Sequence, residues 1–288
     1  MNEALRAAAC PICGSESVFL FDKGRYKVDR CVNCGLGFID PVPGAREMEK
    51  FYNSGNYYKR EDAGYSDYVS LEKGHKRIYA GFIRSAGKSL GFDIRGKSVL
   101  DVGCAHGFFL DTAKEMGAEG LWGTDITMES GRLIESKGYR FSCGSFESLD
   151  LPEGAFDLVF LGDVFEHLFD PFEATARLSR ILRPGGVVIL TTVNFASPFV
   201  RLAGRKWRLM VPPEHIYYWT AKSLGMLFER HGFKGFCKGY WMYVEKSYLA
   251  GRFRVQFGFS PFFFKLYPFS VVPVRSFDTM LCFFRKKD

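Results

Sequence analysis

Apolar and polar positions alternate in a repeating order through the middle of the chain. The apolar run at 98–102 leads into a glycine-bearing turn, and apolar positions then recur with helical spacing over 108–116. Strand, turn and helix alternate five times in this way, with strands ending near residues 125, 145, 163 and 194. The pattern predicts an α/β fold built on a doubly wound, mostly parallel sheet. The segment at 276–287 is expected to add a final strand.

Polar side chains stand at the carboxyl ends of four of the predicted strands. They belong to Asp101, Asp125, Ser145 and Asp163. Ligands of open parallel sheets bind outside the carboxyl ends of the strands, so we expect these residues to line one cleft. An acid at the end of the second strand, here Asp125, suits both hydroxyls of a ribose.

The turn after the first strand carries the pattern D-x-G-x-x-x-G, formed by Asp101, Gly103 and Gly107. Dinucleotide-binding enzymes use G-x-G-x-x-G instead, where the glycines approach a pyrophosphate. An acid at the strand end suits a ligand's ammonium group, while the start of the following helix suits a carboxylate. Cys104 lies within this turn and is expected to touch the ligand.

Together these motifs resemble class I S-adenosylmethionine-dependent methyltransferases. The resemblance covers residues 98–235 and rests on LDVGCAHG, the strand end at Asp125, FDLVFLGDVFEHL and RILRPGG. It implies a seven-stranded, mostly parallel, Rossmann-like sheet. It also implies S-adenosylmethionine as the methyl donor.

The same resemblance implies which residues contact the cofactor. Three hold the methionine part, one binds the ribose and two flank the adenine ring; in that order they are Asp101, Gly103 and Gly107, then Asp125, then Ile126 and Phe146. Many relatives carry an acid at the position of Ser145, so serine implies a weaker or different contact to the adenine amino group. Asp163 is expected to line the same pocket.

A histidine in an aromatic loop follows the fifth predicted strand. The block PPEHIYYWT at 212–220 places His215 beside Glu214 and close to the strand ends. Such a histidine is a candidate proton acceptor, and the alternative is a histidine that only packs the loop. If His215 is not the base, the alternatives are His167, a tyrosine, or no base at all.

A second group of polar residues follows the fourth predicted strand. Asp163, Glu166 and His167 resemble the acid-x-x-E-H group by which some O-methyltransferases hold a divalent ion. A metal there would acidify a substrate hydroxyl. Alternatively, Asp163 lines the cofactor pocket while Glu166 and His167 begin a helix.

The acceptor side also resembles a narrower group of enzymes. The PPEHIYYWT block, the paired cysteines near the N-terminus and a tyrosine-rich connector are similar to sugar C-methyltransferases that act on nucleotide-linked deoxysugars. They are equally similar to shorter methyltransferases found among polysaccharide-assembly proteins. The resemblance implies His215 as the base. It leaves nucleotide-sugar and lipid-linked acceptors open.

Two C-x-x-C pairs, each followed by glycine, occur near the N-terminus. Their members are Cys10 and Cys13, then Cys31 and Cys34. Four thiolates close a tetrahedral shell around Zn²⁺ and leave no open position, which is typical of a structural site. A redox dithiol and a disulfide pair are the alternatives, but two pairs at this spacing favour zinc. Residues 1–40 are too few to build a core alone, so the metal would supply stability.

Composition and charge narrow the class of protein and its partners. A hydrophobic content of 47% excludes global disorder, and a net charge of +7 suits an anionic small molecule, nucleic acid or membrane. The fourth strand end lacks an N-P-P-Y motif and the chain lacks a long basic run, so nucleic acid is not expected. With no secretory or spanning segment, a cytoplasmic location is expected. The scattered cysteines are expected to be small core residues: Cys104, Cys143, Cys237 and Cys282.

The chain is expected to divide into three parts. Residues 1–40 form a zinc ribbon, 41–95 a tyrosine-rich helical connector or lid, and 96–288 the methyltransferase domain. An aromatic and basic insertion is expected at 240–276. Its mixture of Phe, Arg and Lys over 250–275 suits peripheral contact with the inner membrane face and equally suits a packing surface or a dimer contact.

Overall fold

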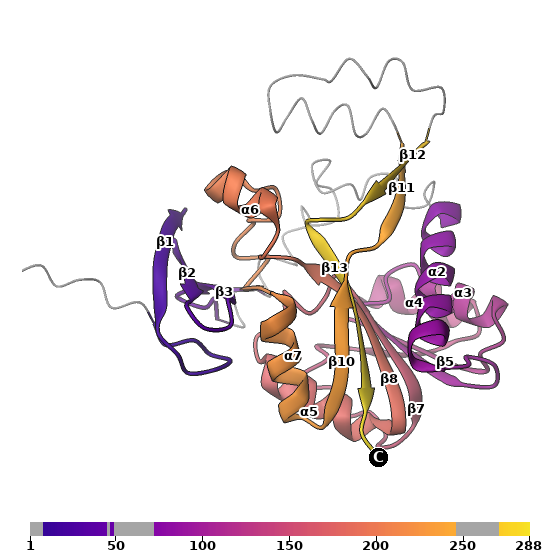
Figure 1. Cartoon of the computed structure of the whole chain (residues 1–288). Helices are drawn as coiled ribbons and strands as arrows, with labels where there is room; N and C mark the ends of the chain where they lie inside the picture. Colours follow the sequence, from indigo (N-terminus) through magenta and orange to yellow (C-terminus); the bar gives the residue numbers. More distant parts are fainter. Residues whose placement is uncertain (1–7, 45–46, 49–71, 246–270) are drawn as a thin grey trace, which may run out of the picture.

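The computed structural model describes residues 8–44, 47–48, 72–245 and 271–288, and a seven-stranded sheet forms its centre (Figure 1). In spatial order the strands are β10 (Phe233–Lys238), β13 (Thr279–Lys286), β8 (Leu182–Val193), β7 (Phe156–Gly162), β4 (Ser98–Val102), β5 (Gly120–Asp125) and β6 (Arg140–Cys143). All run in one direction except β13, which is antiparallel to both β8 and β10. The predicted doubly wound α/β fold is confirmed, as is its final strand.

Helices cover both faces of this sheet (Figure 1). One face carries α2 (Glu72–Leu90), α3 (Phe108–Glu115) and α4 (Met128–Ser136), and the other carries α5 (Pro171–Ile181) and α7 (Ala221–Arg230). Successive residues of a strand point to opposite faces, so Val99 joins the core under α2 and α3 while Leu100 joins the core under α5 and α7. Because both faces are covered, the central strands β4 and β7 are mostly apolar and buried, whereas the edge strands β6 and β10 are more polar and more exposed.

A smaller sheet lies beside the α7 face and contains the cysteine pairs. Its order is β1 (Ser17–Lys23), β2 (Tyr26–Cys31), β3 (Gly37–Asp40) and β9 (Tyr217–Tyr218). The sequence does not predict β9, which is a two-residue strand from a distant part of the chain. Residues 8–40 are therefore joined, through β3, to the loop that carries His215, rather than standing apart from it.

Shorter elements lie at the carboxyl ends of the parallel strands. They are α6 (Pro198–Ala203), η3 (Gly204–Lys206) and a two-stranded arm of β11 (Trp241–Glu245) and β12 (Val271–Arg275). The arm corresponds to the two ends of the predicted insertion, whose middle lies outside the described residues. So does much of the predicted connector, although its expected helix is confirmed as α2. Among the described residues, no helix is long and apolar enough to cross a membrane.

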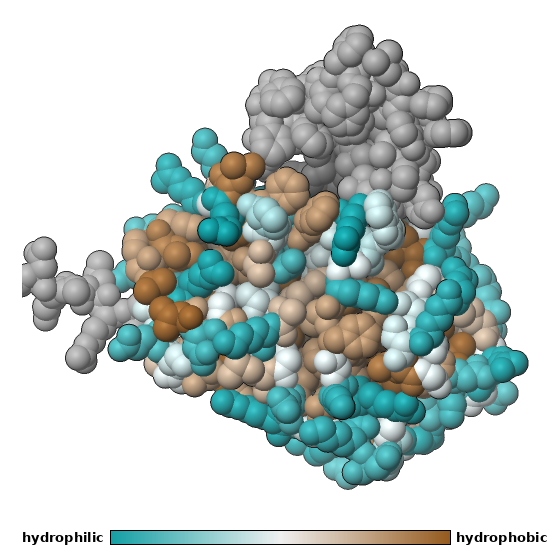
Figure 2. Space-filling model, viewed as in Figure 1, coloured by the Kyte–Doolittle hydropathy of each residue, from teal (hydrophilic) through white to brown (hydrophobic). Residues whose placement is uncertain are grey.

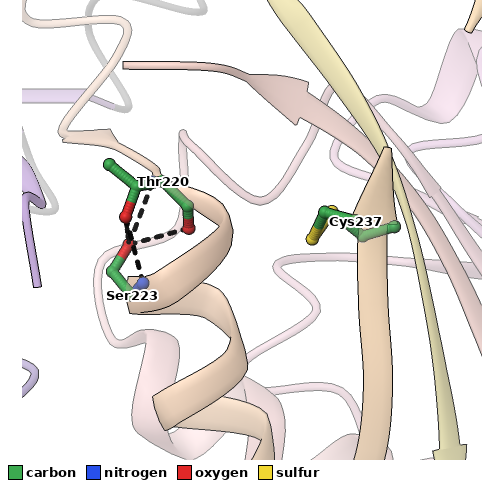
Figure 3. Close-up of a disulfide and its surroundings, with 4 residues drawn as sticks. Thr220, Ser223 and Cys237 are labelled. Atoms are coloured by element: carbon green, nitrogen blue, oxygen red, sulfur yellow. Dashed lines mark hydrogen bonds between the residues drawn. A yellow bond between two sulfur atoms is a disulfide. The ribbon is translucent and has the colours of Figure 1, made fainter. Parts of the chain in front are cut away.

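A disulfide joins Cys237 on β10 to Cys282 on β13 (Figure 3). The two residues face each other in the antiparallel register, which brings their sulfurs together. Figure 3 also shows Thr220 and Ser223 exchanging hydrogen bonds at the start of α7. Cys282 is a buried core residue, as expected, but the expectation is wrong for Cys237, which is only partly buried. It is also wrong for Cys143, which is exposed, whereas Cys104 is buried and free.

Candidate functional site

Asp125 is held at the end of β5 by the backbone of two neighbouring loops. Its Oδ2 accepts a hydrogen bond from the Ala105 N–H at 3.1 Å, and its Oδ1 accepts from the Thr127 N–H and Oγ1, each at 3.0 Å. The carboxylate thus ties the turn after β4 to the start of α4. This places the predicted ribose ligand at the carboxyl edge of the sheet, next to the glycine-bearing turn.

Asp101 lies on the adjacent strand and is almost fully buried, with 3% of its surface exposed. No hydrogen bond joins its carboxylate to a residue that the structure describes. Burial, and then the charge of Asp125, raise the pKa of Asp101 well above its usual value. A buried carboxyl in this position gains most from a bound cation, so it fits the ammonium group of S-adenosylmethionine.

The turn between these residues requires glycine at two positions. Gly103 and Gly107 have φ angles of 70° and 73°, which other residues rarely adopt. A Cβ on Gly103 would lie 2.6 Å from Val164 Cγ2, and one on Gly107 would lie 2.5 Å from Ile134 Cδ1. The turn therefore packs directly against the loop after β7. Gly103 itself is exposed and presents its backbone to solvent.

Cys104 points away from this opening. A Cβ on Gly123 of β5 would lie 2.7 Å from Cys104 Sγ, and Cys104 belongs to the core on the α3 side. Burial is the largest cause that raises the pKa of its thiol. The side chain is therefore a packing residue, and only its backbone remains for the predicted contact with the ligand.

The expected adenine residues occupy different environments. Ile126 is 46% exposed at the rim of the cleft, whereas Phe146 is 4% exposed and joins the core on the α5 side. Ser145 Oγ donates to Glu147 Oε2 at 2.9 Å. Glu147 is an acid at this edge that the sequence analysis missed, and its position two residues after Ser145 was the available signal.

Asp163 directly follows β7, the strand beside β4 in the sheet, and has a left-handed backbone conformation. Its φ of 54° is uncommon for a residue other than glycine, and such conformations cluster at functional sites. The side chain is exposed, and its Oδ1 accepts from Thr191 Oγ1 at 3.0 Å. Asp163 thus stands open beside the turn of β4, as expected for a residue that lines the pocket.

Two histidines meet just beyond Asp163. The rings of His167 and His215 lie 4.8 Å apart between centroids and nearly perpendicular to each other. Their loops are joined because the Ile216 N–H donates to the Glu166 carbonyl at 2.9 Å. The buried Glu166 side chain accepts from Thr192 Oγ1 at 2.9 Å.

Backbone carbonyls fix the tautomers of both rings. His167 Nδ1 lies 2.7 Å from the Glu214 carbonyl, and His215 Nδ1 lies 2.8 Å from the Leu209 carbonyl. Because a carbonyl can only accept, each Nδ1 carries the hydrogen and each Nε2 keeps its lone pair. Burial lowers the pKa of His167 to about 4 and that of His215 well below its usual value, so both rings are neutral near pH 7.

The expected roles of the surrounding acids change in two respects. Glu214 contributes its backbone carbonyl to His167 rather than a carboxylate to His215. The ligand atoms of Glu166, His167 and His215 all lie within 4.8 Å of one another, a group that could hold a metal ion. His215 therefore joins this group in place of Asp163, which the sequence predicted as a ligand. Burial, and then Asp163, raise the pKa of Glu166 to about 8.

Two residues of this region were not predicted as site residues. Tyr240, which follows β10, is close enough for the charges of Asp163 and Glu166 to raise its phenol pKa, although burial contributes more. Arg208 binds Asp278 at 2.9 Å, and its charge lowers the pKa of His215. In the sequence, Arg208 is one of several basic residues between positions 201 and 208, and no local pattern identifies Tyr240 as a site residue.

The four N-terminal cysteines form a compact group. Their sulfurs lie within 4.8 Å of one another, with Cys10 and Cys34 at 3.6 Å and Cys13 and Cys31 at 3.4 Å. Zn–S bonds of about 2.3 Å in a tetrahedron separate the sulfurs by about 3.8 Å. The thiols therefore fit a zinc ion with small adjustments.

The cysteine group is anchored to the α/β body of the chain. Thr220 Oγ1 donates to the Cys34 carbonyl at 2.7 Å, and Arg230 donates to the Ile12 carbonyl at 2.6 Å. Thr220 lies at the start of α7 and Arg230 at its end. Since β3 also pairs with β9, the group supports the loop that carries His215.

Comparison with known proteins agrees with this geometry. A family model described as a methyltransferase domain matches residues 74–237. A tRNA U34 carboxymethyltransferase of Idiomarina loihiensis is 31% identical over 49% of this chain and 47% of its own length. A ubiquinone biosynthesis O-methyltransferase of the same organism is 31% identical over 44% of this chain and 53% of its own length. The chain thus spans about half the length of these curated relatives.

Solved structures share the fold. A SAM-dependent methyltransferase from Archaeoglobus fulgidus superposes with a TM-score of 0.52 at 18% identity, covering 77% of this chain and all of the other. At that identity the likeness concerns architecture alone.

Proposed function

This chain belongs to the methyltransferase-domain family and is an S-adenosylmethionine-dependent enzyme, and from that premise we propose that it methylates a small sugar-type or lipid-linked acceptor. The observation that supports this most is the position of His215. A neutral, buried histidine whose Nδ1–H is held by the Leu209 carbonyl lies against His167 of the loop after β7, and that loop packs on the cofactor turn through Val164.

The residues of the cleft divide the work of binding between them. Asp101 would hold the ammonium group, Asp125 the ribose and the backbone at Gly103 the carboxylate of S-adenosylmethionine. The bound cofactor supplies a methyl group already activated by its sulfonium. The remaining tasks belong to the chain: to align the acceptor with that methyl and to remove one proton.

His215 is proposed as the group that removes the proton. Its Nδ1–H is committed to the Leu209 carbonyl, so the ring cannot rotate freely and Nε2 stays directed away from that loop. Burial keeps the ring neutral and therefore able to accept a proton. Tyr240 and Arg208 are proposed to line the acceptor pocket. Tyr240 lies close enough to Asp163 for that charge to add to burial in raising its pKa, and Arg208 lies close enough to His215 for its charge to add to burial in lowering the pKa of the ring.

We expect His215→Gln to lower turnover by about 100-fold or more, the usual contribution of a positioned base, while affinity for S-adenosylhomocysteine changes less than about twofold. The assay would follow transfer of a labelled methyl group to nucleotide-linked deoxysugars, lipid-linked sugars and bulk tRNA, which identifies the acceptor first. His231→Gln is the matched control, because His231 caps α7 through a carbonyl contact and lies outside the site. Unchanged turnover in His215→Gln would show that His215 is not the base.

Nucleic acid is the competing class of acceptor, because one of the curated relatives is named as a tRNA carboxymethyltransferase. Against nucleic acid stand the loop after β7, which reads LGDVFEHL, and the lack of a long basic run. In the assay above, transfer to tRNA but to neither sugar substrate would replace the small-molecule acceptor.

A second candidate function is metal-assisted O-methylation, favoured by the grouping of Glu166, His167 and His215. Histidines that bind metals commonly donate their other N–H to a backbone carbonyl, and both rings do so here. A divalent ion held by these residues would lower the pKa of an acceptor hydroxyl, and His215 would then be a ligand rather than a base.

Metal counting separates the two candidates. If His215 acts as a base, we expect only the zinc of the cysteine group, about one ion per chain. If the second candidate holds, a further ion should be present that disappears in His167→Gln and persists in Cys10→Ser. Turnover should then also fall when chelator is added and return with Mg²⁺ or Mn²⁺.

A further inference from the structure

Large apolar side chains are exposed together at the carboxyl edge of the sheet. Leu202 is 73% exposed, Trp241 63%, Phe277 49% and Phe199 37%. They come from three separate segments, yet the rings of Phe199 and Phe277 lie 6.3 Å apart, and Trp241 pairs with Arg275 two residues before Phe277. We call these four residues, with the cations named next, the α6 face.

Four exposed cations accompany the apolar residues: Arg201, Arg205, Lys206 and Arg275. None of them forms an ion pair with a residue that the structure describes. The acid nearest in sequence, Asp278, is bound by Arg208 instead. In the view of Figure 2, brown and teal side chains lie side by side where α6 is labelled in Figure 1. The α6 face therefore combines apolar surface with uncompensated positive charge.

We propose that the α6 face binds an anionic membrane surface. Apolar side chains that project beside arginine and lysine enter the boundary between headgroups and acyl chains, while the cations lie among lipid phosphates. Trp241 has the amphipathic ring that favours this boundary. The charge complementarity selects anionic lipid over neutral lipid. The proposal rests on described residues only, and of these Arg275 alone belongs to the segment 250–275.

The α6 face is connected to the candidate active site. The Asn194 N–H donates to the Asp278 carbonyl at 2.7 Å just after β8, and the Asp278 side chain binds Arg208, whose charge acts on His215. A bilayer held against the α6 face would lie at the carboxyl edge of the sheet, where the acceptor enters. This placement of the bilayer, which rests on the proposed function, favours a lipid-linked acceptor over a soluble nucleotide sugar.

Sedimentation with vesicles tests the membrane contact directly. We expect the full chain to sediment with vesicles of phosphatidylcholine and phosphatidylglycerol, to bind pure phosphatidylcholine weakly, and to be released by high salt. Phe199→Ser with Leu202→Ser should weaken binding by about tenfold, since two apolar side chains leave the interface. Arg201→Gln and Lys206→Gln should each weaken it by about fivefold.

Phe236→Ser is the matched control, because Phe236 is 39% exposed but lies on the edge strand β10. It should bind vesicles like the unchanged chain, and all variants should keep the same melting temperature. Equal binding to both vesicle types, no binding, or unchanged binding in the Phe199 and Leu202 variant would overturn the proposal. S-adenosylhomocysteine binding, measured in the same variants, should stay unchanged, so a failure here is distinct from a failure of the proposed function.

Discussion

Asp125→Ala should bind S-adenosylhomocysteine about 100-fold more weakly than the unchanged chain, because hydrogen bonds to a charged group contribute about 1.5–3 kcal/mol each. The substitution removes the proposed ribose contacts. It also frees the Ala105 and Thr127 N–H groups that the carboxylate holds, so the turn between Asp101 and Gly107 loses one of its hydrogen bonds to β5. Isothermal titration calorimetry measures the affinity.

Asp157→Ala is the control for lost structural hydrogen bonds. Asp157 Oδ2 accepts from the Ser98 N–H at 2.9 Å and is paired with Arg183, at the opposite end of the strands. We expect this variant to lose stability but to bind S-adenosylhomocysteine normally. If Asp125→Ala kept its affinity, or if Asp157→Ala lost as much, the role given to Asp125 would be wrong.

Cys10→Ser combined with Cys34→Ser should abolish zinc binding and lower the melting temperature by on the order of 10 °C. Structural zinc contributes about 10–16 kcal/mol to the folding of small zinc-finger peptides, and the sheet of β1, β2 and β3 has only a small core of its own. Because Thr220 binds the Cys34 carbonyl and β3 pairs with β9, the loop carrying His215 should loosen as well. Metal analysis and thermal unfolding measure these effects.

Because the cysteine group supports the loop of His215 and not the cofactor turn, its loss should affect methyl transfer and cofactor binding differently. Methyl transfer should fall in the double variant, whereas S-adenosylhomocysteine binding should be kept, since Asp101 and Asp125 lie on strands that do not contact the zinc group. Cys143→Ser, at an exposed cysteine, should change none of these properties. Full zinc content in the double variant, or no zinc in the unchanged chain, would contradict the proposal of a structural zinc site.

The cofactor side of the molecule could be predicted from sequence because its signals are local. A buried strand, a turn with glycines and the start of a helix are contiguous over residues 98–116, and the fold fixes where such turns lie. Gly103 and Gly107 need positive φ angles within that short segment. The strand ends at Asp125 and Asp163 follow from the same periodicity.

The acceptor side depends on contacts between distant residues, which periodicity does not reveal. His167 and His215 meet only because the Ile216 N–H binds the Glu166 carbonyl. Tyr240 reaches the site from the end of β10, after the whole sheet has formed. The Cys237–Cys282 disulfide likewise requires the register between β10 and β13, which are separated in sequence. Pairing across the fold, rather than local pattern, decides these features.

The account depends most on one claim, that the cleft beside Asp101 and Asp125 binds S-adenosylmethionine. Calorimetric titration of the unchanged chain with S-adenosylmethionine tests it most directly. We predict saturable binding at one site per chain, displaced by S-adenosylhomocysteine. A titration that shows no binding at any accessible concentration, with the chain folded, would contradict it.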